Sequence, residues 1–273
     1  IRGHSNVQGM GSMAVTPALK TAVFERLTAE GVNVPSMKGY DTMASIQAAS
    51  NKEMDFAFCL GGNLYGSNPD SKTVARAFSN IDTVVYLSTS LNTGHAWGTG
   101  KETIILPVLA RDEERQSTTQ ESMFNFVRLS DGGISRHENL RSEVEVISEI
   151  AARVLGNDDI FHWSKLENHN SIRKLIAQII PGFESMDNIG KTKNEFHIPG
   201  RILHKPTFPT ETGKAKFIFH PIPNLNLLKD NEFHLLSVRS EGQFNTVVYE
   251  EEDLYRGQER RDVVMMNKKD MIH

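Results

Sequence analysis

Met54-Asp55-Phe56-Ala57-Phe58-Cys59-Leu60 is a mostly apolar stretch that stops abruptly at Gly61-Gly62-Asn63. A short apolar run bounded by turn residues is typical of a buried β-strand. Two further runs of this kind follow, at residues 82–87 and 103–108, and a helix beginning near Asn68 separates the first from the second. This order of elements predicts an α/β fold with a Rossmann-like parallel sheet and flanking helices.

The predicted topology also indicates where a ligand would bind. Right-handed crossovers place the loops after Leu60 and Leu87 at the same edge of the sheet, the one formed by the carboxyl ends of the strands. Open α/β sheets bind nucleotide-sized ligands at this edge. Helices are expected to flank the sheet, one from Thr16-Pro17 to Gly31 and one beginning at Asp41, which has the side chain of a good N-cap.

Beyond the sheet, the clearest helix signal is a capping-box pattern at Ser142 and Glu145, with an apolar stripe that runs to Gly156. A strand is expected at residues 124–129 and another helix at residues 172–179. The C-terminal part contains three strand-like segments, at 214–219, 235–238 and 263–266. We therefore expect two domains, an α/β domain at 1–232 and the beginning of a β domain at 233–273.

Composition excludes several classes of protein. The 30 Lys and Arg residues against 34 Asp and Glu residues give a net charge of −4, so the one-sided basic field of a nucleic-acid-binding protein is missing. Cys59 is the only cysteine, which rules out an internal disulfide and favours the cytoplasm. No apolar run approaches the roughly 20 residues of a membrane span. The sequence begins Ile1-Arg2 without an initiator Met, so we expect an internal piece of a longer protein.

Common catalytic motifs are missing from the sequence. Gly190-Lys191-Thr192 has the end of a phosphate-binding loop, but Ser185 stands where the first glycine of that motif belongs. The histidines have no metal-ligand spacing, and we predict no protein metal ligand. Polar stretches at residues 2–9, 61–63 and 237–246 instead combine glycines with guanidinium, amide and hydroxyl donors, which suit phosphates, carbonyls and pterin edges.

Several motifs together carry a resemblance. In chain order they are Arg-Gly-x-x-Asn-Val-Gln-Gly at 2–9, Leu-Gly-Gly-Asn at 60–63, a polar pair before Leu91-Asn92, Ile-Ile-Leu-Pro at 104–107, Thr-Gly-Lys-Ala-Lys-Phe at 212–217 and Val-Arg-Ser-x-Gly-Gln-Phe-Asn-Thr at 238–246. This ordered set resembles the large subunit of the molybdopterin oxidoreductases, in their formate-dehydrogenase-like branch. Members of that family bind two molybdopterin guanine dinucleotides around one molybdenum or tungsten.

The resemblance implies catalytic roles for two residues near the N-terminus. Arg2 matches a family arginine close to the metal, where a guanidinium can hold an anionic substrate such as formate and stabilise developing charge. His4 stands where formate dehydrogenases usually have glutamine, which leaves the substrate open. An iron–sulfur cluster and the metal-ligating residue would belong to a preceding part of the protein, and the remaining barrel to a following part.

The resemblance also implies a set of cofactor contacts. Those in the α/β domain are Asn63, Ser88, Thr89 and Glu143, the last as an acceptor for guanine. Those in the C-terminal stretch are Arg239, Ser240, Gln243, Asn245 and Thr246, in a loop that grips a pterin and its phosphates. Each of these side chains could alternatively serve only to cap a turn.

The sequence thus predicts the cofactor-binding part of a molybdopterin-dependent oxidoreductase that oxidises a small substrate and passes electrons to an acceptor. By itself this part is expected to be inactive, because the cofactor carries the redox chemistry. One alternative is a stand-alone nucleotide-binding α/β module without redox chemistry. Another is the middle domain of a thiamin-diphosphate enzyme, which leaves the stretches at 2–9 and 239–246 unexplained.

Overall fold

The computed structural model describes residues 6–15, 20–156, 161–199, 207–208, 210–222, 228–229, 232–238, 252–260 and 262–272, together with the backbone of 243–244 and 247–248. The chain divides into two compact units, Ile1–Lys214 and Ala215–His273, and each is described separately. The predicted division into 1–232 and 233–273 remains a prediction.

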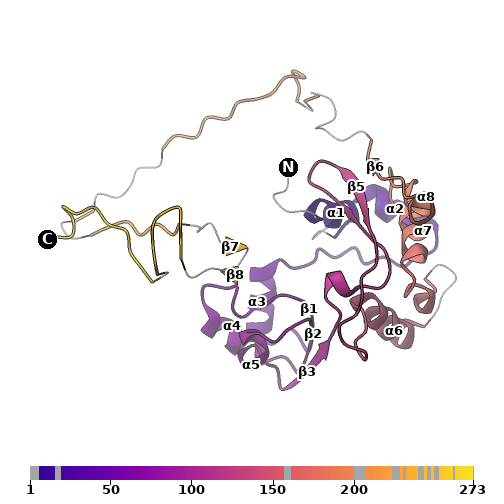
Figure 1. Cartoon of the computed structure of the whole chain (residues 1–273), viewed down its shortest axis with the longest axis horizontal. Helices are drawn as coiled ribbons and strands as arrows, with labels where there is room; N and C mark the ends of the chain where they lie inside the picture. Colours follow the sequence, from indigo (N-terminus) through magenta and orange to yellow (C-terminus); the bar gives the residue numbers. More distant parts are fainter. Residues whose placement is uncertain are drawn as a thin grey trace. The chain divides into compact units, whose positions relative to one another are not determined.

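The predicted parallel sheet is confirmed. It consists of β1 (Phe56–Leu60), β2 (Thr83–Ser88) and β3 (Glu102–Pro107) in the order β1-β2-β3, and both pairs of strands are parallel (Figure 1). Leu60 is opposite Leu87, and Ser88 is opposite Pro107. The carboxyl ends of all three strands therefore lie along one edge.

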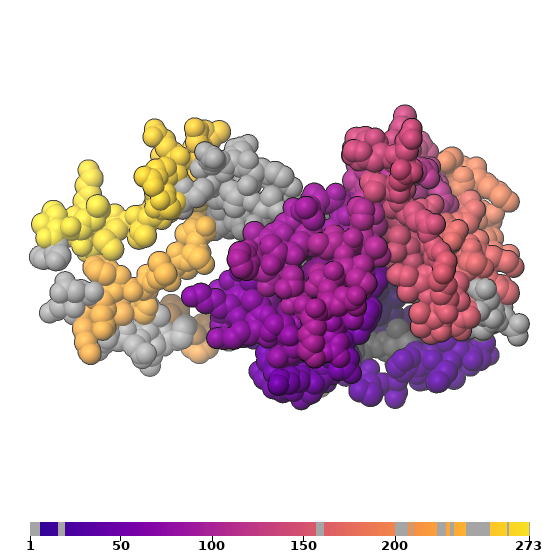
Figure 2. Space-filling model, turned by 90° about the horizontal axis from the view of Figure 1, so that it is seen from below, coloured from indigo at the N-terminus to yellow at the C-terminus, as the bar shows by residue number. Residues whose placement is uncertain are grey.

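Helices cover both faces of this sheet. Successive side chains of β2 point to opposite faces, and each face packs against different helices. Val84 and Tyr86 pack against α3 (Thr42–Ser50) and α4 (Ser71–Phe78), whereas Val85 and Leu87 pack on the opposite side against α6 (Glu143–Leu155). The segments from β1 to β3, purple to magenta, form one packed mass (Figure 2). This arrangement confirms the predicted Rossmann-like α/β class, with the core at the central strand.

Two of these helices have the N-caps predicted from the sequence, Asp41 for α3 and Ser142 for α6, and the helix expected near Asn68 is capped by Asp70. Asp41 accepts a hydrogen bond from the Ala44 backbone N–H, and Asp70 accepts one from the Thr73 backbone N–H. At α6 the Ser142 hydroxyl accepts from the Glu145 N–H, and the Glu145 carboxylate accepts from the Ser142 N–H. Each cap satisfies donors that the first helical turn leaves unpaired.

The N-terminal helices differ from the expectation. The helix α2 spans Thr21–Ala29 and begins after Lys20, while the predicted start at Thr16-Pro17 lies outside the described residues. Three short helices had not been predicted, namely α1 (Val7–Ser12), α5 (Thr93–Trp97) and α8 (Met186–Thr192). Part of the polar stretch at 2–9 is therefore helical.

A second layer of the first unit is built on an antiparallel sheet. Its strands are β4 (Thr118–Glu121), β5 (Phe126–Ser130) and β6 (Phe196–His197), in the order β4-β5-β6. The 3₁₀ helices Arg111–Glu113 and Trp163–Lys165 and the helix α7 (His169–Ile179) accompany it. Val23, Val127, Ile179, Phe183, Met186, Ile189 and Ile198 form its buried apolar cluster.

In the second unit, the strands predicted at 214–219, 235–238 and 263–266 are wrong, because the backbone there has no strand structure. Phe217 and Leu235 are 97% and 89% exposed. A strand is stabilised by a partner strand and a packed face, and strand-type composition does not suffice without them. The β structure described in this unit is β7 (Gln243–Phe244) paired antiparallel with β8 (Val247–Val248), and a bridge between Asp253 and Gln258.

Candidate functional site

The loops that follow β1 and β2 are joined by hydrogen bonds at the carboxyl edge of the parallel sheet. The Gly61 backbone N–H donates to the Leu87 carbonyl at 2.8 Å. The Asn63 Nδ2 donates to Thr93 Oγ1 at 2.9 Å, and Asn92 Nδ2 donates to the Gly62 carbonyl at 3.2 Å. The two loops therefore lie at the same edge, as the topology predicted, and they are also hydrogen-bonded to each other.

The two glycines of the first loop are required by the backbone. Gly61 has φ +64° and Gly62 has φ +72°, a region in which residues with a Cβ are strained. A Cβ added at either position would meet no atom within 4 Å. Open space therefore lies next to these two residues, so that a ligand could approach the backbone closely.

Asn63 holds the first loop in shape. Its Oδ1 accepts a hydrogen bond from the Gly66 N–H at 2.8 Å, while its Nδ2 reaches Thr93. A Cβ on Gly66 would lie 2.6 Å from Asn63 Nδ2, and one on Gly94 would lie 2.7 Å from Asn63 Oδ1, so glycine at both positions makes room for this amide. An amide nitrogen has two N–H groups, and the second remains for another acceptor.

Ser88 ends β2 and contacts a histidine that sequence reasoning missed. The Ser88 hydroxyl lies 3.0 Å from His95 Nε2, and both residues are buried. The Asn92 backbone N–H donates to His95 Nδ1 at 2.9 Å, which completes a capping box at the start of α5. The spacing Asn92-x-x-His95 could have indicated this cap. The neighbouring Thr89 is exposed at the same strand end.

The fourth described candidate, Glu143, is the first residue of α6, and α6 begins beside the end of β3. The Val108 N–H donates to the Ser88 carbonyl at 3.1 Å, and Val108 forms a parallel bridge with Arg141, directly before α6. This pairing sets the first turn of α6 at the carboxyl edge. Glu143 is half-buried there, and burial raises the pKa of its carboxyl. Asn63, Ser88, Thr89 and Glu143 thus all lie along one edge.

The other predicted site residues are not described. Arg2, His4, Arg239, Ser240, Asn245 and Thr246 lie outside the described residues. Gln243 is described only through its backbone, as part of β7. Their proposed roles therefore stay predictions.

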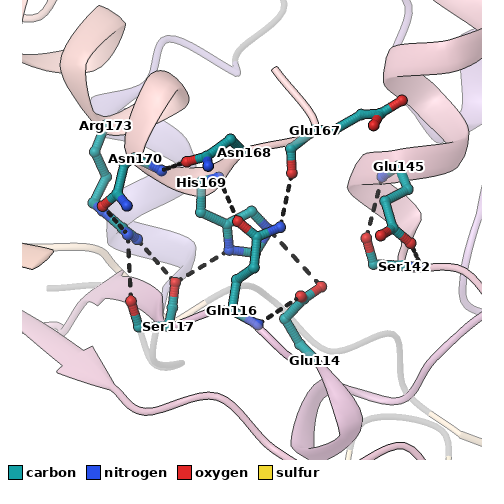
Figure 3. Close-up of polar contacts among 10 residues, drawn as sticks. All are labelled: Glu114, Gln116, Ser117, Ser142, Glu145, Glu167, Asn168, His169, Asn170 and Arg173. Atoms are coloured by element: carbon teal, nitrogen blue, oxygen red, sulfur yellow. Dashed lines mark hydrogen bonds and ion pairs between the residues drawn. The ribbon is translucent and has the colours of Figure 1, made fainter. Parts of the chain in front are cut away.

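A second polar cluster lies at the start of α7 and is structural (Figure 3). Arg173 is 3% exposed; its Nη1 donates to the Ser117 carbonyl at 2.9 Å and its Nη2 to Asn170 Oδ1 at 2.8 Å. Burial lowers the pKa of this guanidinium. His169 Nδ1 lies 3.1 Å from the same Ser117 carbonyl, and the Gln116 side chain bonds the backbone of Glu167 and His169. The cluster fastens the segment before β4 to α7.

A polar cleft of about 580 Å³ opens beside α6. Its lining residues are Arg115, Glu138, Asn139, Leu140, Arg141, Glu145, Glu149 and Glu167. Arg141 and Glu149 pair with each other, and Glu145 is engaged in the N-cap of α6.

Within the described ranges, no group of three or more His, Cys, Asp and Glu residues is placed to hold a metal ion. Nor does any described helix have the length and apolar character to cross a membrane.

The chain is similar to several curated proteins, some of which are named as oxidoreductases. Uncharacterized oxidoreductase Rv2900c of Mycobacterium tuberculosis is 30% identical over 99% of this chain, and Protein YdeP of Escherichia coli is 30% identical over 98%. F420-dependent formate dehydrogenase subunit alpha of Methanocaldococcus jannaschii is 26% identical over 79%. The chain spans 36%, 37% and 33% of the length of these relatives, respectively. No protein-family model matches the chain.

Proposed function

We propose that this chain binds the guanine dinucleotide part of a molybdopterin cofactor, within an oxidoreductase that resembles formate dehydrogenase. The observation that carries the proposal is the hydrogen-bonded junction of the loops after β1 and β2, through Asn63 and Thr93, at the ligand-binding edge of an α/β sheet. The similarity to a formate dehydrogenase subunit, over 79% of this chain, supports the same assignment.

The residues at the edge fit a dinucleotide in their chemistry. The open space beside Gly61 and Gly62 lets a phosphate approach the backbone of this loop closely. The Asn63 amide and the Ser88 hydroxyl supply neutral donors, which suit phosphate and sugar oxygens. Glu143 supplies a carboxylate with two acceptor oxygens, which matches the adjacent N–H groups on the edge of guanine.

When bound, the cofactor with its molybdenum or tungsten would supply the two-electron redox chemistry. The chain itself binds and orients the group. We assign Arg2 to holding an anionic substrate such as formate, because a guanidinium binds a carboxylate through two parallel hydrogen bonds. His4 would contact the same substrate. The loop from Arg239 to Thr246 would hold the pterin and its phosphates, and the electron acceptor and an iron–sulfur cluster would lie with other parts of the enzyme.

Calorimetric titration of the 273-residue chain with GDP and with ADP tests the proposal. We expect weak binding of GDP and still weaker binding of ADP, because the Glu143 carboxylate accepts hydrogen bonds from guanine and repels the acceptor N1 of adenine. Glu25→Gln, on the distant helix α2, serves as the matched control for Glu143→Gln. Equal affinity for the two nucleotides, or no loss on Glu143→Gln, would contradict the assignment.

A further inference from the structure

The His95 imidazole is held from both sides in the structure. His95 is 8% exposed, and its ring lies edge-on to Tyr86, with ring centroids 4.9 Å apart and an interplanar angle of 84°. The Tyr86 hydroxyl in turn donates to the Gly98 carbonyl at 2.5 Å. His95 Nδ1 accepts from the Asn92 backbone N–H, and His95 Nε2 faces the Ser88 hydroxyl. The ring orientation is therefore fixed by packing and by two hydrogen bonds.

These contacts select one tautomer of the ring. The Asn92 backbone N–H can only donate, so Nδ1 must be the nitrogen without a proton. A neutral imidazole then carries its proton on Nε2. It follows that Nε2–H donates to Ser88 Oγ, 3.0 Å away, and that the serine oxygen is the acceptor in this pair.

This direction of donation has a consequence for Ser88. Because its oxygen accepts from His95, its own O–H group is left to donate to another acceptor. Within the described part of the chain, this hydroxyl hydrogen-bonds to the side chain of His95. Without His95 the hydroxyl could rotate and present either a donor or a lone pair to a ligand.

We propose that His95 is a positioning residue that holds Ser88 as a hydrogen-bond donor toward an anionic oxygen of the ligand at the carboxyl edge. The inference rests on the proposed function for the identity of the ligand, with GDP as the probe. The Ser88 hydroxyl held in this way would discriminate between ligand groups, because a fixed O–H donor favours phosphate oxygens over groups that are themselves donors.

A purely structural role is the alternative, in which His95 only completes the capping box of α5. The two roles use different ring nitrogens, so two substitutions separate them. His95→Asn places an oxygen near the position of Nδ1, which keeps the acceptor for Asn92 but cannot reach Ser88. His95→Gln places its amide nitrogen near the position of Nε2 and can donate to Ser88 again.

The experiment measures GDP affinity by NMR titration of the 273-residue chain. We expect His95→Asn and Ser88→Ala each to weaken GDP binding by about three- to tenfold, the loss of about one hydrogen bond. The double variant should bind no more weakly than Ser88→Ala, because His95 acts through that hydroxyl. His95→Gln should recover affinity to within about twofold of the original chain. Additive losses, or unchanged affinity in His95→Asn, would overturn the inference.

A second measurement tests the role of His95 independently of whether the chain binds GDP. Imidazole ¹⁵N chemical shifts of His95 should report the Nε2–H tautomer, with a change in the Nε2 shift on Ser88→Ala. The Nδ1–H tautomer would overturn the positioning role whether or not GDP binds. If GDP perturbs no residue at the edge while the Nε2–H tautomer is observed, the proposed function fails, and the hydrogen bond from His95 Nε2–H to Ser88 Oγ is supported.

Discussion

The backbone N–H of Gly61 donates to the carbonyl of Leu87, so the two polar loops leave the sheet from strand ends that are bonded to each other. Leu60 and Leu87 are directly opposite in the parallel register, and the hydrogen bond extends this pairing by one residue beyond β1. The positions of Asn63 and Ser88 are therefore set by the rigid sheet. A ligand that contacts both residues would meet a largely preformed surface.

Gly62→Ala should destabilise the chain and weaken GDP binding together. Its φ of +72° strains a residue with a Cβ by about 1 kcal/mol. Gly31→Ala is the matched control, because Gly31 has φ +83° and an added Cβ would also meet no atom within 4 Å. Gly31 comes just after α2, well before Gly62 in the sequence. Thermal unfolding should show similar losses for both variants, with GDP affinity reduced in Gly62→Ala alone. A loss of affinity in both variants would mean that strain anywhere weakens binding.

Asn63→Ala should lower the free energy of unfolding by about 1–2 kcal/mol, since it removes one hydrogen bond within the first loop and one from that loop to Thr93. Asn63→Asp keeps the acceptor for the Gly66 N–H but loses the donor to Thr93 and adds a negative charge. We expect it to be less destabilising than Asn63→Ala and to abolish GDP binding through repulsion of the phosphates. Asn51→Ala, which loses only exposed contacts, should leave both quantities nearly unchanged. Urea unfolding and titration of each variant provide the check.

Glu143→Gln should have opposite effects on stability and on GDP binding. Burial raises the pKa of Glu143 in the folded chain, so the unfolded state gives up this proton more readily. The contribution of this group to stability is therefore largest below the ordinary carboxyl pKa, and is lost as pH rises through the raised value. The variant should gain thermal stability at pH 7 and show no gain at pH 3. A less stable variant at pH 7 would show that Glu143 has a favourable partner in the folded chain.

Arg173→Met should destabilise the first unit by about 2–3 kcal/mol, because the Ser117 and Asn170 side chains and the Ser117 carbonyl lose buried hydrogen bonds. Arg153→Met is the control, since Arg153 is exposed and its ion pair with Glu149 is worth about 0.5 kcal/mol or less. Urea denaturation distinguishes the two. Neither variant should alter GDP affinity, because within the described part of the chain the hydrogen bonds of Arg173 go to Ser117 and Asn170 and not to Asn63, Ser88 or Glu143.

Local signals in the sequence were sufficient for most of the parallel sheet and its helices. Asp41, Asp70 and Ser142 each accept a hydrogen bond from the backbone N–H three positions ahead, and such contacts do not depend on the rest of the fold. The common edge of the loops after Leu60 and Leu87, which carry Asn63 and Ser88, followed from the handedness of crossovers.

Features that depend on residues far apart in the sequence could not be predicted from local sequence signals. Residues 214–219 have a strand-like composition, but none of the described strands pairs with them, and Phe217 is exposed. On β1, Phe56 and Leu60 are also exposed, since α6 packs over β2 and β3. The bond between Ser88 and His95 needs the loop after β2 to fold back onto its own strand, which periodicity does not reveal.

Mapping backbone amide shifts during a GDP titration shows whether the loops after β1 and β2 bind a guanine nucleotide. We predict that GDP shifts the amides of Gly61, Gly62, Asn63, Ser88 and Thr89, and that ADP at the same concentration shifts them less. Perturbations confined to other parts of the chain, with these five amides unchanged at saturating GDP, would contradict the account.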